Sequence, residues 1–179
     1  MTLRNAIAAG CFALASSFAI NANAQSFADC VSTDLIQFDG TIVDAALATP
    51  ELSTLVTALS AADLVDTLDT IDDVTVYAPT NDAFGAIPAD ILGDLLADVP
   101  SLTDVLVYHV SPGRLNPRKF LTTVRRDTLN GQNVFFHRNN GAARVNNAAV
   151  DCQGVSTTNG DVYFIDSVLM PEYKQVLTQ

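Results

Sequence analysis

The sequence predicts an α+β domain in which a cluster of short helices packs beside a mainly antiparallel sheet. Apolar residues recur at helical spacing through much of residues 42–109, and one strand-like run interrupts them at residues 74–77. After Gly113 the period changes to that of strands, and turn signals separate the strand-rich segments. Helices followed by a run of strands are typical of α+β domains rather than of parallel α/β sheets.

Start signals and apolar faces indicate the first helices. One helix is expected directly after Gly40-Thr41. The next begins at Thr49-Pro50-Glu51, which combines an N-cap residue, a proline at the first position and an acid in the first turn. Its apolar face consists of Leu52, Leu55, Val56 and Leu59. Residues Asp63–Thr70 are predicted to form a further short helix and a turn.

The middle of the chain is predicted to hold one buried strand and three short helices. Residues Val74–Tyr77 form the strand, since they are β-branched or aromatic. Thr80 is the expected N-cap of the first helix, and Pro88 starts the second. Ser101 and Asp104 resemble a capping box at the start of the third.

The second half of the chain is predicted to consist of strands joined by tight turns. Asparagine and glycine favour the positive φ angles that such turns require. The turn signals are Asn130-Gly131, Asn139-Asn140-Gly141 and Asn159-Gly160, and the strand-rich segments are 134–138, 144–150 and 162–169.

The N-terminus resembles a secretory signal peptide. Arg4 supplies a positive charge, Ala6–Ile20 is almost entirely apolar, and Ala22-Asn23-Ala24 is a small-x-small cleavage sequence. Lipidation at Cys11 is the alternative interpretation. We therefore expect four parts: a removed signal peptide (1–24), a lead-in that carries Cys30 (25–40), one domain (41–171) and a short tail (172–179).

Two cysteines remain after the predicted cleavage, Cys30 and Cys152. In an oxidising compartment an even pair indicates a disulfide, while two buried free thiols are the alternative. A bridge between them would close a loop of roughly 120 residues, worth nominally about 5 kcal/mol by chain entropy.

The charge distribution is uneven. The chain has a net charge of −11, and no Lys or Arg occurs between Ser26 and Asp104. Seven of its nine basic residues fall between Arg114 and Arg144. An acidic surface keeps an exported protein soluble, whereas a basic patch could meet an anionic partner. Nucleic acid is not an expected partner of so acidic a protein.

Three blocks in order resemble the fasciclin-like domain family. The first is Thr75–Phe84, the second is the Tyr-His block Leu106–Gly113, and the third is the closing block Asn159–Pro171. The resemblance covers residues 41–171. It implies a wedge-shaped β-sandwich with a cluster of short helices, a role in adhesion or cell-surface contact, and neither catalytic residues nor a cofactor.

Two departures from the family pattern bear on the partner. Animal members carry an Asp-Ile pair associated with receptor contact, and here Cys152 follows Asp151 in its place. The closing strand has Tyr163 or Phe164 where a histidine is common. An exported bacterial-type member is therefore expected, in the periplasm or secreted, rather than an integrin ligand.

Eight residues are candidate partner contacts. All but Asp151 also have a structural interpretation: Tyr108 as a packing residue, His109 as a hydrogen-bonded core histidine, Asn81 as part of the cap of the short helix through Phe84, and the arginines as a solvated face. The candidates are Tyr108, His109, Asn81, Asp151, Arg114, Arg118, Arg125 and Arg126.

No catalytic or metal-binding motif is recognisable in the sequence. It lacks a Gly-x-Ser-x-Gly elbow, a His-Glu-x-x-His helix, a calcium loop and a phosphate-binding loop. A non-catalytic binding or adhesion module is therefore predicted, with a cell-surface or matrix protein or glycan as partner. The alternatives are a binder of a small apolar molecule or lipid between helices and sheet, and a hydrolase using His109 or His137.

Overall fold

The computed structural model describes residues 32–139 and 141–172. The predicted signal peptide, Cys30 and all but the first residue of the predicted tail lie outside the described residues. Mixed helices and a twisted sheet make up the described part, which confirms the predicted α+β class.

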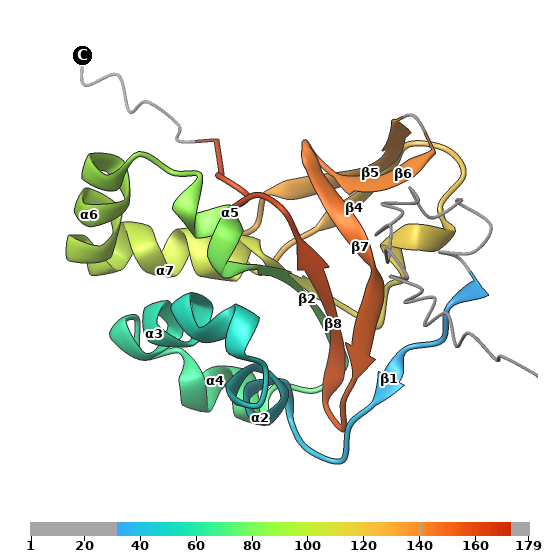
Figure 1. The fold of residues 1–179 in the computed structure, drawn as a ribbon, viewed down its shortest axis with the longest axis horizontal. Coiled ribbons are helices and arrows are strands. Elements are labelled where there is room, and N and C mark those ends of the chain that lie inside the picture. Colours follow the sequence, from blue (N-terminus) through green and yellow to red (C-terminus); the bar gives the residue numbers. More distant parts are fainter. Residues whose placement is uncertain (1–31, 140, 173–179) are drawn as a thin grey trace, which may run out of the picture.

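The core of the fold is an eight-stranded sheet that curls until it almost closes (Figure 1). Seven strands follow the order β3-β2-β8-β7-β6-β5-β4, and β1 pairs with β7. The pairs β2–β8 and β1–β7 are parallel and the others antiparallel. The Leu129 amide donates to the Val110 carbonyl at 2.8 Å, which links the two ends of the sheet. The strands are β1 (Ile36–Gln37), β2 (Val74–Pro79), β3 (Val110–Pro112), β4 (Val124–Asp127), β5 (Asn133–Asn139), β6 (Ala142–Val145), β7 (Ala148–Ser156) and β8 (Gly160–Ile165).

The α-helices gather at one end of the molecule, away from strands β4 to β6 (Figure 1). They are α2 (Ile42–Leu47), α3 (Ser53–Ala61), α4 (Val65–Thr70), α5 (Asn81–Gly85), α6 (Ala89–Ala97) and α7 (Val99–Tyr108), with short 3₁₀ helices η1 (Pro50–Leu52) and η2 (Pro117–Lys119).

Capping side chains fix two of the helix starts. Thr41 and Asp44 form a reciprocal capping box on α2. Thr80 accepts from the Ala83 amide and so caps α5, as predicted. The capping box predicted at Ser101 is wrong, because α7 already begins at Val99 and the Ser101 hydroxyl donates to Asp98 at 2.6 Å.

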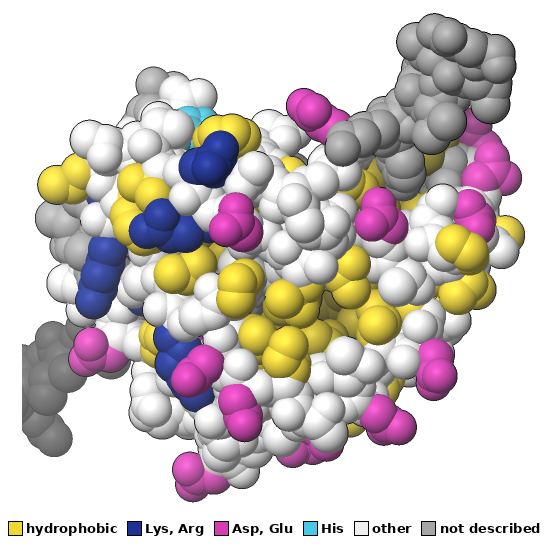
Figure 2. Space-filling view, turned by 180° about the vertical axis from the view of Figure 1, so that it is seen from behind, with side chains coloured by type: hydrophobic (Ala, Val, Ile, Leu, Met, Phe, Trp, Pro, Cys, Tyr) yellow, Lys and Arg dark blue, Asp and Glu magenta, His cyan; other side chains and the backbone are white. Residues whose placement is uncertain are grey.

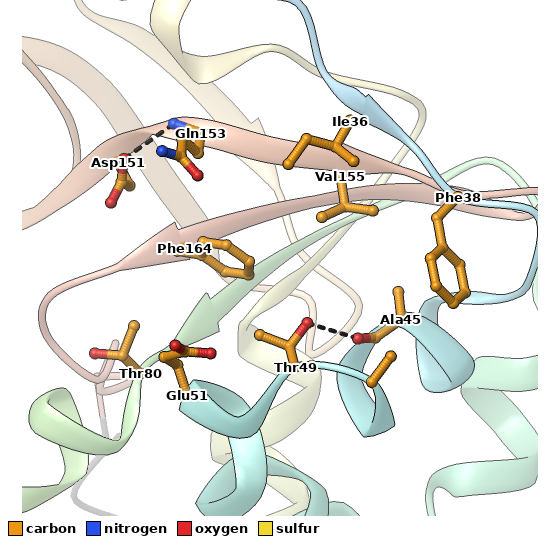
Figure 3. Close-up of a pocket in the computed structure, with 11 residues that line it drawn as sticks. Ile36, Phe38, Ala45, Thr49, Glu51, Thr80, Asp151, Gln153, Val155 and Phe164 are labelled. Carbon is orange, nitrogen blue, oxygen red and sulfur yellow. Dashed lines mark hydrogen bonds between the residues drawn. The ribbon is translucent and has the colours of Figure 1, made fainter.

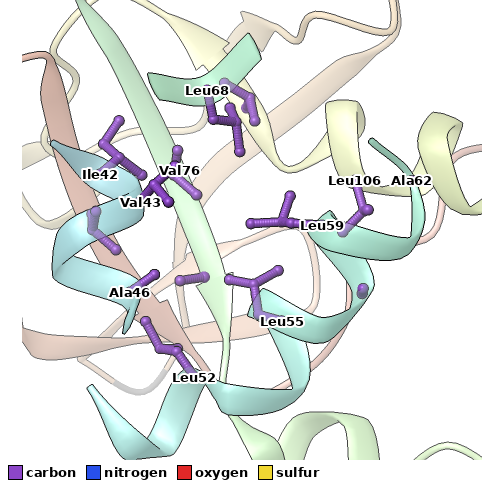
Figure 4. Packing of buried hydrophobic residues seen from close by; sticks show 14 of the residues in the cluster. Ile42, Val43, Ala46, Leu52, Leu55, Leu59, Ala62, Leu68, Val76 and Leu106 are labelled. Carbon is purple, nitrogen blue, oxygen red and sulfur yellow. The ribbon is translucent and has the colours of Figure 1, made fainter. Parts of the chain in front are cut away.

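Two hydrophobic cores share the sheet. The helical core lies between the helices and one face of β2 and β8, and its members are aliphatic apart from Phe84 (Figure 4). The strand core fills the curl of the sheet and is built around Tyr77, Phe136 and Tyr163. The Phe136 ring stacks on Phe120 at 5.2 Å and meets Tyr77 edge-on at 5.7 Å, a favourable geometry for aromatic pairs.

Asn159 ties the helices to the sheet. Its side-chain nitrogen donates to the carbonyls of Leu68 and Ile71 at 2.8 and 3.1 Å, and its oxygen accepts from the Ile42 amide at 2.9 Å. These groups belong to α2 and to the end of α4. The sequence indicated only a turn here, whereas the side chain is 5% exposed and joins three segments.

Candidate functional site

Asn81 serves the helical scaffold. Its oxygen accepts from the Thr54 amide at 2.9 Å, and its nitrogen donates to the Pro50 carbonyl and the Ser53 hydroxyl at 3.0 Å each. These bonds satisfy groups at the start of α3, where the first amides have no partner within the helix. Asn81 therefore bonds the start of α3 rather than capping α5, the short helix that it begins, and Thr80 caps α5.

His109 is a core residue, which agrees with its interpretation as a hydrogen-bonded core histidine and not with a role as an exposed partner contact. Its side chain is 2% exposed. Nδ1 lies 2.7 Å from the Val105 carbonyl, and Nε2 accepts from the Leu169 amide at 2.9 Å, so the proton is assigned to Nδ1. Burial lowers the pKa of His109 to about 4. The ring is thus a neutral link between α7 and the closing segment.

Tyr108 is also buried, at 4% exposure, which corrects its prediction as a surface contact. Its hydroxyl donates to the Asn133 carbonyl at 2.9 Å and accepts from the Asn146 side chain at 3.0 Å. Asn146 itself has a φ of 52°, in the left-handed region that asparagine tolerates in tight turns. The Tyr108 hydroxyl therefore holds this turn against β5.

The four candidate arginines have different roles. Arg114 binds Asp161 at 2.9 Å and donates to the carbonyls of Thr157 and Thr158 at 3.0 Å, so it closes the β7–β8 turn. Arg118 is 1% exposed, which corrects its prediction as a surface contact: its guanidinium binds the Cys152 carbonyl and lies 5.4 Å from the centre of the Tyr163 ring. Arg126 lies over Phe120, and only Arg125 projects from the sheet without a described side-chain contact.

Basic side chains are confined to one half of the surface in the view of Figure 2, whereas acidic side chains occur in both halves. Figure 2 shows Lys and Arg in the half that carries strands β4 to β6, while the half that carries the helices shows acidic side chains without basic ones. This agrees with the absence of Lys and Arg between Ser26 and Asp104. Since Arg114 and Arg118 are committed to internal contacts, the basic segment does not act as one uniform patch.

Asp151 lies at an open groove between the helices and the sheet (Figure 3). The groove has a volume of about 510 Å³ and runs between α2 and η1 on one side and β1, β7 and β8 on the other. Phe164 points into it from β8, and Ile36, Phe38 and Val155 form one apolar wall. Ile36 is 56% exposed and so adds an accessible apolar side chain to this wall.

A second hollow of about 430 Å³ extends the groove past Thr80 and Phe164. We call the two together the acidic groove. Its carboxylates are Glu51, Asp82, Asp151 and Asp166, and no Lys or Arg of the described residues lines either part. Asp151 also accepts from the Gln153 amide at 2.9 Å, which fixes its position in the irregular stretch of β7. The apolar floor and the acidic rim of the groove together suit a ligand that is positively charged and partly apolar.

A separate hollow of about 540 Å³ lies beside Tyr108 on the strand half. Arg125, Phe135 and Met170 contribute to its wall, together with the amide side chains of Asn133 and Asn146. Sequence reasoning found Tyr108 and Arg125 but not Phe135, which is 45% exposed in the middle of β5. The alternation of β5 could have indicated it, because Val134 and Phe136 point inward.

The interior between helices and sheet is filled. The cavity there, lined by Leu55, Leu106, Val162 and neighbouring side chains, has a volume of about 10 Å³. Ligand pockets for small molecules are typically about 300–1,000 Å³. An enclosed site for a lipid or small apolar molecule is therefore not present in this part of the fold.

Within the described residues no group of three or more His, Cys, Asp and Glu side chains is placed to hold a metal ion. His109 is enclosed, and its two ring nitrogens bond backbone groups rather than a serine or carboxylate. Cys152 forms a disulfide. Its partner lies outside the described residues, so the Cys30–Cys152 pairing remains a prediction.

A curled sheet with short helices gathered at one end defines the class of α+β domain to which the described part belongs (Figure 1). The chain belongs to the fasciclin family: the family model described as "Fasciclin domain" matches residues 50–171. The fold also resembles a solved domain pair from the insect cell adhesion molecule fasciclin I, with a TM-score of 0.55, 24% identity and coverage of 70% of this chain and 47% of that one.

Bacterial relatives support this assignment. The chain is 41% identical over 131 residues to immunogenic protein MPT70 of Mycobacterium tuberculosis, covering 71% of this chain and 67% of that protein. It is 41% identical over 134 residues to cell surface glycolipoprotein MPB83 of Mycobacterium bovis, covering 73% of this chain and 60% of that protein. It is 38% identical over 133 residues to protein sll1483 of Synechocystis, with 73% of each covered.

Proposed function

We propose that the chain is an exported, non-catalytic binding module of the adhesion type that holds a partner protein in the acidic groove. The observation that carries the proposal is the exposed apolar surface of the groove beneath a rim of carboxylates. Export is supported by the predicted signal peptide and by the cell-surface description of MPB83. None of the helices among the described residues is long and apolar enough to cross a membrane.

The partner segment follows from the chemistry of the groove. Ile36 and Phe164 offer apolar contact, while Glu51, Asp151 and their neighbours attract positive charge. A peptide that carries apolar side chains beside Lys or Arg would match both features, and electrostatic complementarity would also speed its association. A neutral lipid would leave the acidic rim without a partner.

The burial and contacts of His109 support a binding role without catalysis. Burial holds the pKa of His109 at about 4, so this ring is not poised to exchange protons near neutral pH. The hydrolase alternative needs a nucleophile against an accessible imidazole, and the contacts of His109 do not supply one.

The test compares groove variants of the chain from residue 25 onward. Labelled protein is titrated against separated envelope fractions of the source cells over a salt series. Glu51→Gln combined with Asp151→Asn should weaken saturable binding about tenfold at low salt, since two exposed charges contribute roughly 0.5–1 kcal/mol each. Phe164→Ser should weaken binding at every salt concentration.

The matched control removes two charges elsewhere. Asp90 and Asp94 lie exposed on α6, away from the groove. The double variant Asp90→Asn, Asp94→Asn should bind within twofold of the parent chain, a difference of about 0.4 kcal/mol or less. Equal effects of the two charge variants, or binding that ignores Phe164→Ser, would sink the groove as the partner site.

A further inference from the structure

We infer that the outer face of β4, β5 and β6, with the hollow beside Tyr108, is a second binding site, and that it takes an acidic polysaccharide. We call Arg125, Phe135, His137 and Arg144 the basic sheet face. It lies on the strand half, whereas the acidic groove lies between the helices and β7–β8. The inference goes beyond the proposed function, because it concerns another surface and a partner of opposite charge.

Strand register brings the four side chains together. Arg125 on β4 is directly opposite Phe135 on β5, and His137 on β5 is directly opposite Arg144 on β6. Phe135 and His137 are two residues apart, so they share a face. Val134 and Phe136 point into the strand core, which places this shared face outward. Directly opposite residues have Cβ atoms about 4.5–5.5 Å apart, so the four form a continuous strip.

Among residues 32–139 and 141–172, no carboxylate forms an ion pair with the arginines of this strip. Both ion pairs of the described residues involve Arg114. Arg125 and Arg144 therefore have no described carboxylate partner, although the chain carries 20 acidic residues. Arg144 donates to the Asn147 carbonyl, which orients its guanidinium without neutralising the charge. Arginine presents a planar fork of donors that matches sulfate and carboxylate groups.

The hollow supplies the rest of a sugar site. Its volume of about 540 Å³ falls within the range of small-molecule sites. Phe135, 45% exposed, offers an apolar surface for the C–H face of a sugar ring. The amide residues Asn133 and Asn146 also line the hollow. Glu172 also lies at the rim and would favour sugar hydroxyls over anionic groups at that end.

The narrow distribution of positive charge favours a linear polysaccharide over an anionic membrane or nucleic acid. The strip is narrow, and the chain as a whole carries a charge of −11. A flexible polymer can lie along the strip alone, whereas a flat anionic membrane would also face the surrounding carboxylates. Nucleic acid binds proteins through extended basic surfaces, which a narrow strip on a chain with a net charge of −11 does not provide.

The experiment titrates the chain from residue 25 onward with heparin as the probe. The comparison probes are inorganic polyphosphate, neutral dextran and vesicles with anionic headgroups. We expect saturable heparin binding and none to dextran. Arg125→Ala with Arg144→Ala should weaken heparin binding at least about tenfold at low salt and reduce the slope of log K against log salt by about two. Phe135→Ala should weaken heparin binding about fivefold and change polyphosphate binding less than twofold, consistent with about 1 kcal/mol for ring stacking.

Lys119→Ala is the matched control, since Lys119 is exposed in η2 rather than on the strip. It should change heparin affinity less than Arg125→Ala. Equal losses of heparin affinity in Lys119→Ala and Arg125→Ala would show that binding depends only on the net charge of the protein. That result would overturn the proposed site. So would an equal effect of Phe135→Ala on both polyanions, binding to the vesicles alone, or no heparin binding at all. None of these outcomes bears on the groove, whose variants carry a different set of substitutions.

Discussion

The helical half and the strand half of the molecule have hydrophobic cores of different composition. The helical core is almost wholly aliphatic, and its surface carries carboxylates without Lys or Arg. The strand core contains tyrosines and encloses the guanidinium of Arg118, and its surface carries most of the basic residues. One sheet therefore supports two surfaces of opposite charge. A module of this kind could join a cationic partner on one side to an anionic partner on the other.

The helices are tied to the shared sheet by polar contacts as well as by apolar packing, and Asn159 makes several of these contacts. Asn159→Ala would leave the Ile42 amide and the carbonyls of Leu68 and Ile71 without their partner. Each unsatisfied buried group costs about 1–3 kcal/mol, so we expect a loss of about 4 kcal/mol in the free energy of unfolding. Urea denaturation measures it, with Asn147→Ala as the control because Asn147 is exposed. A loss below 1 kcal/mol would show that the helices are held by apolar packing alone.

The disulfide at Cys152 should stabilise the border between the halves. Cys152 lies in the irregular stretch of β7, and its carbonyl accepts from Arg118. Reduction of the disulfide should lower the free energy of unfolding by about 3 kcal/mol. In Cys152→Ser, the free energy of unfolding should no longer depend on added reductant. Peptide mapping of the unreduced chain should give a Cys30–Cys152 peptide. Recovery of Cys30 as a free thiol would exclude that pairing.

His109 links the two cores, and protonation should weaken the link. Its pKa of about 4 in the folded chain is below the usual 6.5, so its contribution is complete above pH 6.5 and is lost as the pH falls towards 4. Between pH 7 and pH 5 the loss should be about 2 kcal/mol in the free energy of unfolding.

Urea midpoints at the two pH values test this link in the parent chain and in His109→Gln. The variant should be less stable at pH 7 and should lose less on acidification. His137 is the natural control, since it is the other histidine of the chain and lies half-buried on a strand. A smaller loss on acidification in His109→Gln than in His137→Gln would assign the effect to His109. A parent-like pH dependence in His109→Gln would assign the effect to carboxylates instead.

Local signals predicted much of the fold but little of the site. Helix periodicity, the cap at Thr80 and the glycine turns at Gly131 and Gly141 depend on neighbouring residues, and the structure agrees with them. The groove could not be predicted in this way, because Ile36, Glu51 and Phe164 come from distant parts of the chain. Their proximity depends on the parallel pairing of β1 with β7 and of β2 with β8.

Exposure was the property that the sequence predicted least well. Tyr108, His109 and Arg118 carry polar groups that are common at binding surfaces, yet all three are buried. Each is buried because backbone groups at fixed positions satisfy it: Asn133 for Tyr108, Val105 and Leu169 for His109, and Cys152 for Arg118. Side-chain chemistry alone does not distinguish a polar residue that finds partners inside the fold from one that meets a partner outside.

Arg114, which bonds groups within the fold, and Arg125, which is exposed, allow the two kinds of polar residue to be compared by experiment. The expected changes in stability are the smallest of those predicted. Arg114 binds the Asp161 carboxylate, whose side chain is only 11% exposed, and the carbonyls of Thr157 and Thr158. Arg114→Ala should cost about 1–2 kcal/mol in the free energy of unfolding, because it leaves an almost buried carboxylate without its partner. Arg125→Ala should change stability by less than about 0.5 kcal/mol, since the side chain is exposed without an ion pair.

The binding effects should run in the opposite direction. Arg125→Ala should weaken heparin binding in a chain of unchanged stability, while Arg114→Ala should leave heparin affinity within twofold, about 0.4 kcal/mol, at a temperature where the chain stays folded. Arg114→Lys should restore part of the stability, because an ammonium can meet Asp161 but cannot also reach both carbonyls with a planar fork. Equal stability losses in the two alanine variants would mean that Arg125 has an internal role, and the basic sheet face would then lose its principal cation.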